Sequence, residues 1–125
     1  MEKFLEILKS KLGPKGYFED PIVMAPYLAD MRGRFFGDIP IITRPKTTEE
    51  VSQIIELCNE FDVTMIPQGG NTGLCAGATP ININTRKVLI SLSRMNKISP
   101  SKSGELYLEV EAGSTLKSVQ MMADN

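Results

Sequence analysis

The chain has 125 residues, a formal net charge of −1, two cysteines and no histidine. Its length fits one domain, and a composition of 42% hydrophobic and 23% charged residues is typical of a globular protein. Without histidine, this chain alone cannot build Ser-His-Asp or Cys-His catalysis, nor a His-ligated zinc, haem or iron site. The near-neutral charge argues against binding to nucleic acid or to an anionic membrane surface.

The cysteines and the N-terminus bear on the compartment. Cys58 and Cys75 are too few for a disulfide scaffold or a four-cysteine metal site, so we expect free thiols and no metal. The first residues carry acids and lack the long apolar core of a signal peptide. No run approaches the ~18 apolar residues of a membrane span. We therefore predict a bacterial cytoplasmic location, or one at the inner face of the membrane, without an integral membrane segment.

The first forty residues predict two helices and a loop. Apolar residues at helical spacing predict an amphipathic helix over 2–12, which ends at Gly13. A short irregular helix is expected over 22–31, followed by a glycine-punctuated loop over 32–38. The aromatic residues of this region are expected to pack in the core; they are Tyr17, Tyr27, Phe35 and Phe36.

A strand, a helix and a strand follow within about thirty residues. Residues 40–43 and 63–66 are β-branched, apolar runs, and both predict strands. Between them, Thr47 and Glu50 form a capping box for a helix over about 48–60. The buried face of that helix is predicted to comprise Val51, Ile54, Ile55, Cys58 and Phe61. The pattern is a βαβ unit, with parallel strands and a right-handed crossover.

The last third of the chain adds two strands and a helix. Strands are predicted over 87–92 and 106–110, and a helix with Ser/Thr capping candidates over 114–124. Met121 and Met122 are expected on the buried face of this helix. The order of elements predicts an α/β (α+β) architecture with a parallel βαβ core and flanking helices.

Charge is unevenly distributed along the chain. Residues 63–104 contain no Asp or Glu and carry +5, from Arg86, Lys87, Arg94, Lys97 and Lys102, whereas the remainder carries −6. This window favours an anion-binding face, although chance clustering is an alternative.

The main motif of the window is a glycine-rich segment directly after the second strand. Four of the ten glycines lie between positions 69 and 77. Glycine permits positive φ, so that successive N–H groups can converge in a nest at the carboxyl end of a strand. Asn71 and Thr72 would add side-chain donors. The spacing matches neither G-x-G-x-x-G nor the P-loop pattern, and no helix directly follows the segment, so little help from a helix dipole is expected. From composition alone, a phosphate site and a ligand-free crossover are equally acceptable.

Several segments together resemble the flavin-binding domain of vanillyl-alcohol-oxidase-like flavoproteins. The branch most similar contains D-2-hydroxyglutarate dehydrogenase, cytochrome-type D-lactate dehydrogenase and the flavin subunit of glycolate oxidase. The resemblance rests on PQGGNTGLCAGA at 67–78, Y-x-x-D-x-R-G-R at 27–34, R-P-x-TTEEV at 44–51, L-x-R-M-N at 92–96 and V-x-A-G-x-T-L at 110–116. It covers about residues 24–124 and implies the first subdomain of an FAD-binding domain of the PCMH type.

The resemblance assigns roles to residues of the glycine-rich segment. Their backbone amides would hold the FAD pyrophosphate, with Pro67 only shaping the loop; the residues are Pro67, Gln68, Gly69, Gly70, Asn71, Thr72, Gly73, Leu74, Gly77 and Ala78. Cys75 is interpreted as a packing residue and not as a flavin linkage. No catalytic residue is assigned. The arginines that could meet a substrate carboxylate are Arg32, Arg34 and Arg94, and for each a surface or structural role is favoured.

The resemblance also implies that residues 1–125 are only the N-terminal portion of a flavoenzyme. A further glycine-rich segment and a substrate cap domain, with its metal-binding histidines, would be absent. We expect the isolated fragment to bind FAD weakly or not at all, and to be inactive without the missing half. The parent would be an FAD-linked D-2-hydroxy-acid dehydrogenase acting on lactate, glycolate or 2-hydroxyglutarate. Two alternatives stay open: a truncated remnant that self-associates or interacts without a cofactor, and a non-redox nucleotide-binding module.

Overall fold

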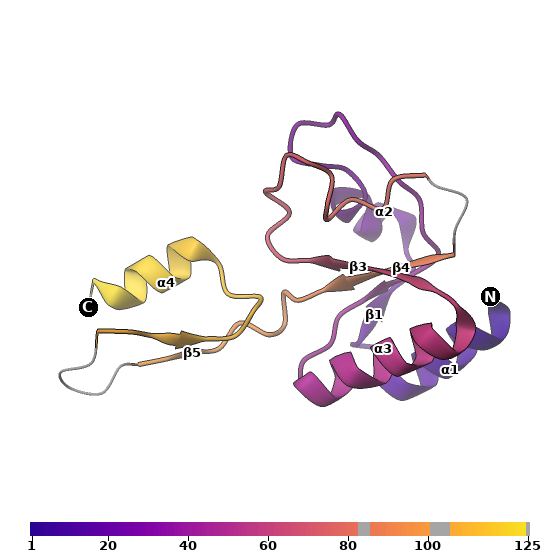
Figure 1. Cartoon of the computed structure of the whole chain (residues 1–125), viewed down its shortest axis with the longest axis horizontal. Coiled ribbons are helices and arrows are strands. Elements are labelled where there is room, and N and C mark those ends of the chain that lie inside the picture. Colours follow the sequence, from indigo (N-terminus) through magenta and orange to yellow (C-terminus); the bar gives the residue numbers. More distant parts are fainter. Residues whose placement is uncertain (83–85, 101–105, 125) are drawn as a thin grey trace.

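The computed structural model describes residues 1–82, 86–100 and 106–124. The described elements form a sheet flanked by helices and, after it along the chain, a small hairpin beside a helix (Figure 1). The architecture is mixed α/β with a parallel core, as the sequence predicted.

The main sheet has the strand order β1-β2-β4-β3. Its strands are β1 (Tyr17–Phe18), β2 (Ile42–Thr43), β3 (Thr64–Gln68) and β4 (Lys87–Ser91). Both β2 and β3 run parallel to β4, and β1 pairs antiparallel with β2. The predicted βαβ strands are therefore parallel, but β4 lies between them. Every residue of β4 is buried, as expected for a central strand covered on both faces.

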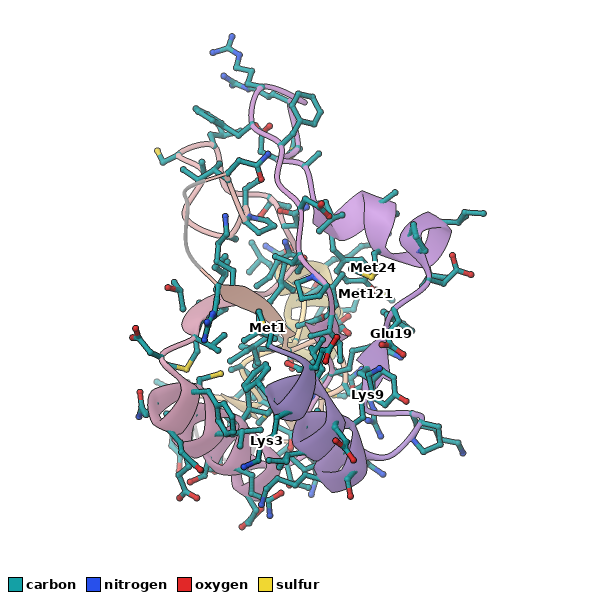
Figure 2. The ribbon with its side chains drawn as sticks, turned by 90° about the vertical axis from the view of Figure 1, so that its right-hand side faces the viewer. Met1, Lys3, Lys9, Glu19, Met24 and Met121 are labelled. Carbon is teal, nitrogen blue, oxygen red and sulfur yellow. The ribbon has the colours of Figure 1, made fainter. Side chains whose placement is uncertain are left out.

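Helices cover the two faces of this sheet. The helices α1 (Glu2–Leu12) and α3 (Thr48–Phe61) lie side by side below it in Figure 1, and α2 (Pro21–Met24) and the 3₁₀ helix η1 (Ala25–Tyr27) lie above. Alternate residues of β4 point to opposite faces: Val88 and Ile90 join the core under α1 and α3, and Leu89 joins the cluster near α2. An ion pair between Lys9 of α1 and Glu19 connects the helix to the chain that follows β1 (Figure 2).

The start of α3 follows the predicted cap. The Thr47 side chain accepts a hydrogen bond from the Glu50 N–H at 3.2 Å, and Asp62 ends the helix in the left-handed conformation. The reciprocal arm differs, because the Glu50 carboxylate accepts from the N–H of Lys46 and not from that of Thr47. The predicted buried face is wrong at one position: Leu57 is buried, whereas Ile55 is 38% exposed.

The strand β3 is longer than predicted. It runs through Pro67 and Gln68, which pair with Ile90 and Ser91 of β4. Proline is acceptable here because β3 is an edge strand, so the missing N–H breaks no ladder on its outer side. The glycine-rich loop thus begins at Gly69, two residues later than its sequence motif.

The smaller unit consists of β5 (Ile98–Ser99), β6 (Glu109–Val110) and α4 (Leu116–Ala123). The strand predicted over 106–110 is wrong in extent, because only its last two residues pair, antiparallel with β5. Leu106 is fully exposed and Val110 is 41% exposed, whereas Leu108 between them is half-buried.

Three predictions about the packing of side chains are also wrong. Phe35 and Phe36 are 40% and 64% exposed, because the loop that carries them projects away from the sheet. Met121 and Met122 lie on an exposed face of α4, and Cys75 is exposed on the glycine-rich loop. In contrast, Tyr27 packs against the cluster of buried residues near α2, as expected.

Candidate functional site

A cavity of about 430 Å³ lies between the glycine-rich loop and the segment that leads into α4. Its lining comes from three stretches of chain and consists of glycines and small polar residues: Gly69, Gly70, Ser93, Asn96, Gly113, Ser114, Thr115 and Ser118. None of these lining residues carries a charge. The cavity can therefore attract an anion only through neutral donors, which are main-chain N–H groups, hydroxyls and the side-chain amide of Asn96.

Two parallel strands place the first two stretches. Gly69 and Gly70 directly follow β3, and Ser93 and Asn96 follow β4. Because β3 and β4 are parallel, both stretches begin at the carboxyl ends of the strands, on the same side of the sheet. The N–H of Leu92 donates to the Gln68 oxygen at 2.9 Å, which holds the two strand ends together. The carboxyl ends of parallel strands are the usual ligand edge of an α/β sheet.

A close backbone approach places the third stretch. The N–H of Gly113 donates to the Met95 oxygen at 2.8 Å, and a Cβ at position 113 would overlap the main-chain oxygen of Leu92. Only glycine can occupy this position. This contact positions the first turn of α4 beside the cavity.

The end of α4 that reaches the cavity is its N-terminus. Thr115 is the N-cap, and its hydroxyl accepts from the Ser118 N–H at 3.2 Å. Residues 69–82 form no helix, in agreement with the sequence. We expected little contribution from a helix dipole because no helix follows the loop directly. However, α4, far along the chain, places the positive end of its dipole at the same cavity.

The loop glycines have no reason within the described residues to be glycine. A Cβ at Gly69, Gly70, Gly73 or Gly77 would meet no atom within 4 Å. None of the four lies in the left-handed region, so neither packing nor backbone strain requires glycine there. This bare main chain fits a bulky anion that must approach it closely.

The predicted nest through positive φ at the glycines is therefore wrong in detail. In this loop the left-handed residues are Asn71, with φ of 54°, and Ala76, with φ of 60°. The loop turns at these two positions, and the glycines serve only to keep its surface free of side chains.

Two predicted site residues use their side chains to hold the loop. The amide of Gln68 donates to the main-chain oxygens of Tyr27 and Ala78, both at 2.9 Å. The amide of Asn71 donates to the oxygens of Pro26 and Ala29, at 3.2 and 2.8 Å. The Asn71 amide protons expected to serve a ligand are thus directed to the protein, and η1 anchors the loop.

Of the residues predicted from the sequence, Gly69 and Gly70 line the cavity. The others lie outside the lining of the cavity, with Pro67 and Gln68 at the end of β3 and the rest in the loop. Pro67, Thr72 and Leu74 are exposed, and Ala78 is half-buried and accepts from Gln68.

The cationic residues of the acid-free window do not line the cavity either. Lys87 is buried and donates to the Ile81 oxygen, and the Arg94 guanidinium donates to the oxygens of Lys15 and Arg44. A structural role for Arg94 is thereby confirmed. Lys102 lies outside the described residues.

A second ordered turn carries Arg32 and Arg34. The buried carboxylate of Asp30 accepts from the N–H groups of Phe35, Arg34 and Arg32 at 2.8, 2.7 and 3.3 Å. These hydrogen bonds, that from Phe35 first, lower the pKa of Asp30 against the opposing effect of burial. Both arginine residues of this turn are exposed.

Within the described part of the chain, no three His, Cys, Asp or Glu side chains come together as a metal site would require. None of the helices in those same residues combines the length and apolar character needed to cross a membrane.

The stretch Gly113 to Ser118 escaped prediction as part of a site. A sequence signal exists, since the turn at 110–116 and its Ser/Thr capping residues are recognisable along the chain. Its position opposite Gly70 depends on the contact of Gly113 with Leu92, which spacing along the chain does not reveal.

Comparisons with known proteins point in one direction. The family model described as FAD binding domain matches residues 39–125. A probable mitochondrial D-2-hydroxyglutarate dehydrogenase from Oryza sativa is 35% identical over 94% of this chain. A mitochondrial D-2-hydroxyglutarate dehydrogenase from Arabidopsis thaliana is 33% identical over 98%, and a putative D-lactate dehydrogenase from Schizosaccharomyces pombe 31% identical over 78%. The chain spans only about one fifth of the length of these relatives, at 19–21%.

Solved structures share the fold. Alkyldihydroxyacetonephosphate synthase superposes with a TM-score of 0.85 at 20% identity, covering 99% of this chain and 25% of that one. p-Cresol methylhydroxylase gives a TM-score of 0.77 at 21% identity, covering 99% and 24%. The expected PCMH-type fold is confirmed.

Proposed function

The chain belongs to the FAD-binding domain family, and on that premise we propose that it is the N-terminal portion of an FAD-linked D-2-hydroxy-acid dehydrogenase. Within the glycine-rich segment, residues 67–74, 77 and 78 would hold the FAD pyrophosphate. The family and the relation to D-2-hydroxyglutarate and D-lactate dehydrogenases rest on the sequence matches. The role of this chain in such an enzyme and the assignment of its site are the proposal.

The observation that carries the proposal is the bare main chain at Gly69 and Gly70. These residues line the cavity, and a Cβ at either position would meet no described atom of the protein. A phosphate needs direct access to backbone N–H groups, and glycine provides it. The same reasoning extends to Gly73 and Gly77, which continue the exposed loop.

The chemistry of the parent enzyme would come from the bound flavin, which accepts a hydride from the C2 of a 2-hydroxy acid and passes electrons to an acceptor. The residues of this chain would bind and orient the cofactor. We assign no catalytic residue within the described part of the chain, because no base or metal site lies near the cavity. A substrate-binding unit would come from the remaining length that the relatives possess.

Exposed apolar residues support a contact with further protein. Leu106 is fully exposed, Leu116 is 72% and Val110 is 41% exposed, all in the unit formed by β5, β6 and α4. Groups of this kind usually mark an interface. We propose that protein corresponding to the additional length of the relatives covers this surface. The names of the Oryza and Arabidopsis relatives include "mitochondrial", and a cytoplasmic location for this chain stays a prediction.

Thermal unfolding with different ligands tests the proposal. FAD should raise the unfolding midpoint of the 125-residue chain, and the variant Gly70→Val should lose the rise without losing its fold. Stabilisation by ADP but not by FAD would favour a nucleotide-binding module without redox chemistry. A chain that is dimeric, has no visible flavin absorbance and shows no change in unfolding midpoint with either ligand would favour the self-associating alternative.

A further inference from the structure

The buried carboxylate of Asp30 takes no part in the proposed phosphate site. Its side chain does not line the cavity, and Asp30 is only 5% exposed. The carboxylate accepts from the main-chain N–H groups of Arg32, Arg34 and Phe35, and none of the described cationic side chains forms an ion pair with it. A carboxylate that is satisfied by main-chain donors fixes the backbone around it. Asp30 therefore holds the conformation of its own turn.

This turn belongs to a small hairpin that exposes one carbonyl oxygen. Ala29 and Phe36 face each other in an antiparallel bridge. The hydrogen bonds of the bridge come from the flanking residues, from the N–H of Asp30 to the Phe35 oxygen at 3.1 Å and from the N–H of Gly37 to the Leu28 oxygen at 2.9 Å. In such a pair the main-chain groups of the two facing residues point away from each other. The Ala29 oxygen is thus held in place and directed out of the hairpin.

The glycine-rich loop binds this oxygen. The side-chain amide of Asn71 donates to the Ala29 oxygen at 2.8 Å, and it also donates to the Pro26 oxygen at 3.2 Å. Asn71 has φ of 54°, in the left-handed region that asparagine adopts more readily than most residues. It directly follows Gly70, which lines the cavity. In Figure 1 the hairpin and the glycine-rich loop lie together above the main sheet.

We propose that Asp30 and Asn71 are positioning residues of the glycine-rich loop. Asp30 fixes the Ala29 oxygen, and Asn71 binds that oxygen and thereby holds the main chain of Gly70 in the conformation that receives a phosphate. The inference rests on the proposed function for its ligand, whereas the relay from Asp30 to the loop concerns the free chain. A loop that is ordered before its ligand arrives binds more tightly, since less conformational entropy is lost on binding.

Amide spectra of the ¹⁵N-labelled chain without ligand test the relay. The variant Asp30→Asn keeps the shape of the side chain but replaces one acceptor oxygen by an NH₂ group. The N–H signals of Gly70 and Asn71 should then shift or broaden well below the unfolding midpoint, where a loss of global stability alone leaves folded-state signals in place. Asp38→Asn, at an exposed carboxylate close in the chain, is the control and should leave both signals unchanged. Unchanged signals in Asp30→Asn would overturn the relay.

Replacement of Asn71 tests the contact of the loop with Ala29. Asn71→Gly removes the amide but still permits a positive φ, so the chain can follow its present course. The affinity for FAD should fall about tenfold, because the loop must then be ordered on binding. Asn71→Asp, which places a carboxylate against two carbonyl oxygens, should weaken binding at least as much. The control is Asn59→Asp at an exposed position of α3, and it should bind like the wild type. Wild-type affinity in Asn71→Gly would reject the positioning role of Asn71.

A double-mutant cycle separates a relay from two independent effects. If Asp30 acts through Ala29 and Asn71, then Asp30→Asn should lower the affinity for FAD in the wild-type background. The same change should have no further effect in the Asn71→Gly background. An equal fold-loss in both backgrounds would reject the relay.

The same variants distinguish this inference from the proposed function. FAD binding that is lost in Gly70→Val but unchanged in Asp30→Asn and Asn71→Gly would leave the proposed function standing and reject the positioning roles. Loop signals that respond to Asp30→Asn in a chain without saturable FAD binding would support the relay and reject the flavin assignment.

Discussion

Gln68 and Tyr27 are joined by a hydrogen bond of 2.9 Å, from the side-chain amide of Gln68 to the main-chain oxygen of Tyr27. The same amide reaches Ala78 at the far end of the glycine-rich loop. Gln68 is 1% exposed, so one buried residue fixes both ends of the loop and its contact with η1. The shape of the candidate phosphate loop therefore depends on a side chain that does not line the cavity.

Replacement of Gln68 should destabilise the chain. The variant Gln68→Met keeps the length of the side chain but leaves the Tyr27 and Ala78 oxygens without their donor, and we expect a loss of about 2–4 kcal/mol in the free energy of unfolding. Urea denaturation measures it. Gln53→Met, at an exposed position of α3, is the control and should stay within about 0.5 kcal/mol of the wild type. Equal stability of the two variants would show that the Gln68 hydrogen bonds are unimportant.

The extent to which the fold was predictable differs between its two units. The helices α1 and α3 were predicted closely, because apolar periodicity and a Thr47 cap are local signals. The two-residue strand β1 and the hairpin of β5 and β6 were missed or misjudged in length, since short strands depend on their partners and not on their own composition.

Of the residues that line the cavity, only those of the glycine-rich loop could be predicted from the sequence. The glycine-rich loop is a continuous motif, and Gly69 and Gly70 do line the cavity. The opposite wall at Ser114 exists because Gly113 packs on the backbone of Leu92, a tertiary contact without a sequence pattern. The roles of Gln68 and Asn71 as anchors were hidden for the same reason, because their partners Pro26, Tyr27 and Ala29 lie 41 to 45 positions earlier.

Replacing either of two glycines by alanine should affect the free energy of unfolding very differently, because one glycine lies in open space and the other lies against the backbone. Gly70→Ala places its methyl group in open space, so the free energy of unfolding should change by less than about 1 kcal/mol. Gly37→Ala would drive a methyl group into the backbone of Pro80 and should be destabilising by about 1–3 kcal/mol or more. Thermal unfolding of both variants without ligand checks the contrast. A strong destabilisation by Gly70→Ala would mean that its glycine is structural and would remove the main support for a ligand there.

The Asp30 turn should make stability depend on acid pH. Hydrogen bonds from Phe35, Arg34 and Arg32 lower the pKa of Asp30 below its usual 3.8, so the folded state favours the charged form. The resulting stabilisation is fully present above the unfolded pKa, near 4, and is lost as the pH falls through the folded pKa. Asp30→Asn should be less stable than the wild type at pH 7, and the difference should shrink below about pH 4. Urea denaturation from about pH 3 to 7 measures this, with Asp38→Asn, at an exposed carboxylate, as control. A difference that is constant with pH would contradict the role of the Asp30 charge.

The two thiols should react at very different rates. Cys75 is exposed on the loop, whereas Cys58 is buried in the core and burial raises the pKa of its thiol to about 11. Ellman's reagent at about pH 8 should therefore modify one thiol rapidly and the other only as the chain unfolds. In Cys75→Ser the rapid phase should vanish and the slow phase persist. Two rapid phases in the folded wild type would place Cys58 outside the core.

The affinity of the chain for FAD, measured by titration calorimetry on the wild type and on Gly70→Val, tests the central claim most directly. The account predicts saturable binding of FAD by the wild type, and a loss of more than about tenfold in Gly70→Val at an unchanged unfolding midpoint. Binding by both proteins with equal affinity, or by neither, would contradict the assignment of the glycine-rich loop as the site of the FAD pyrophosphate.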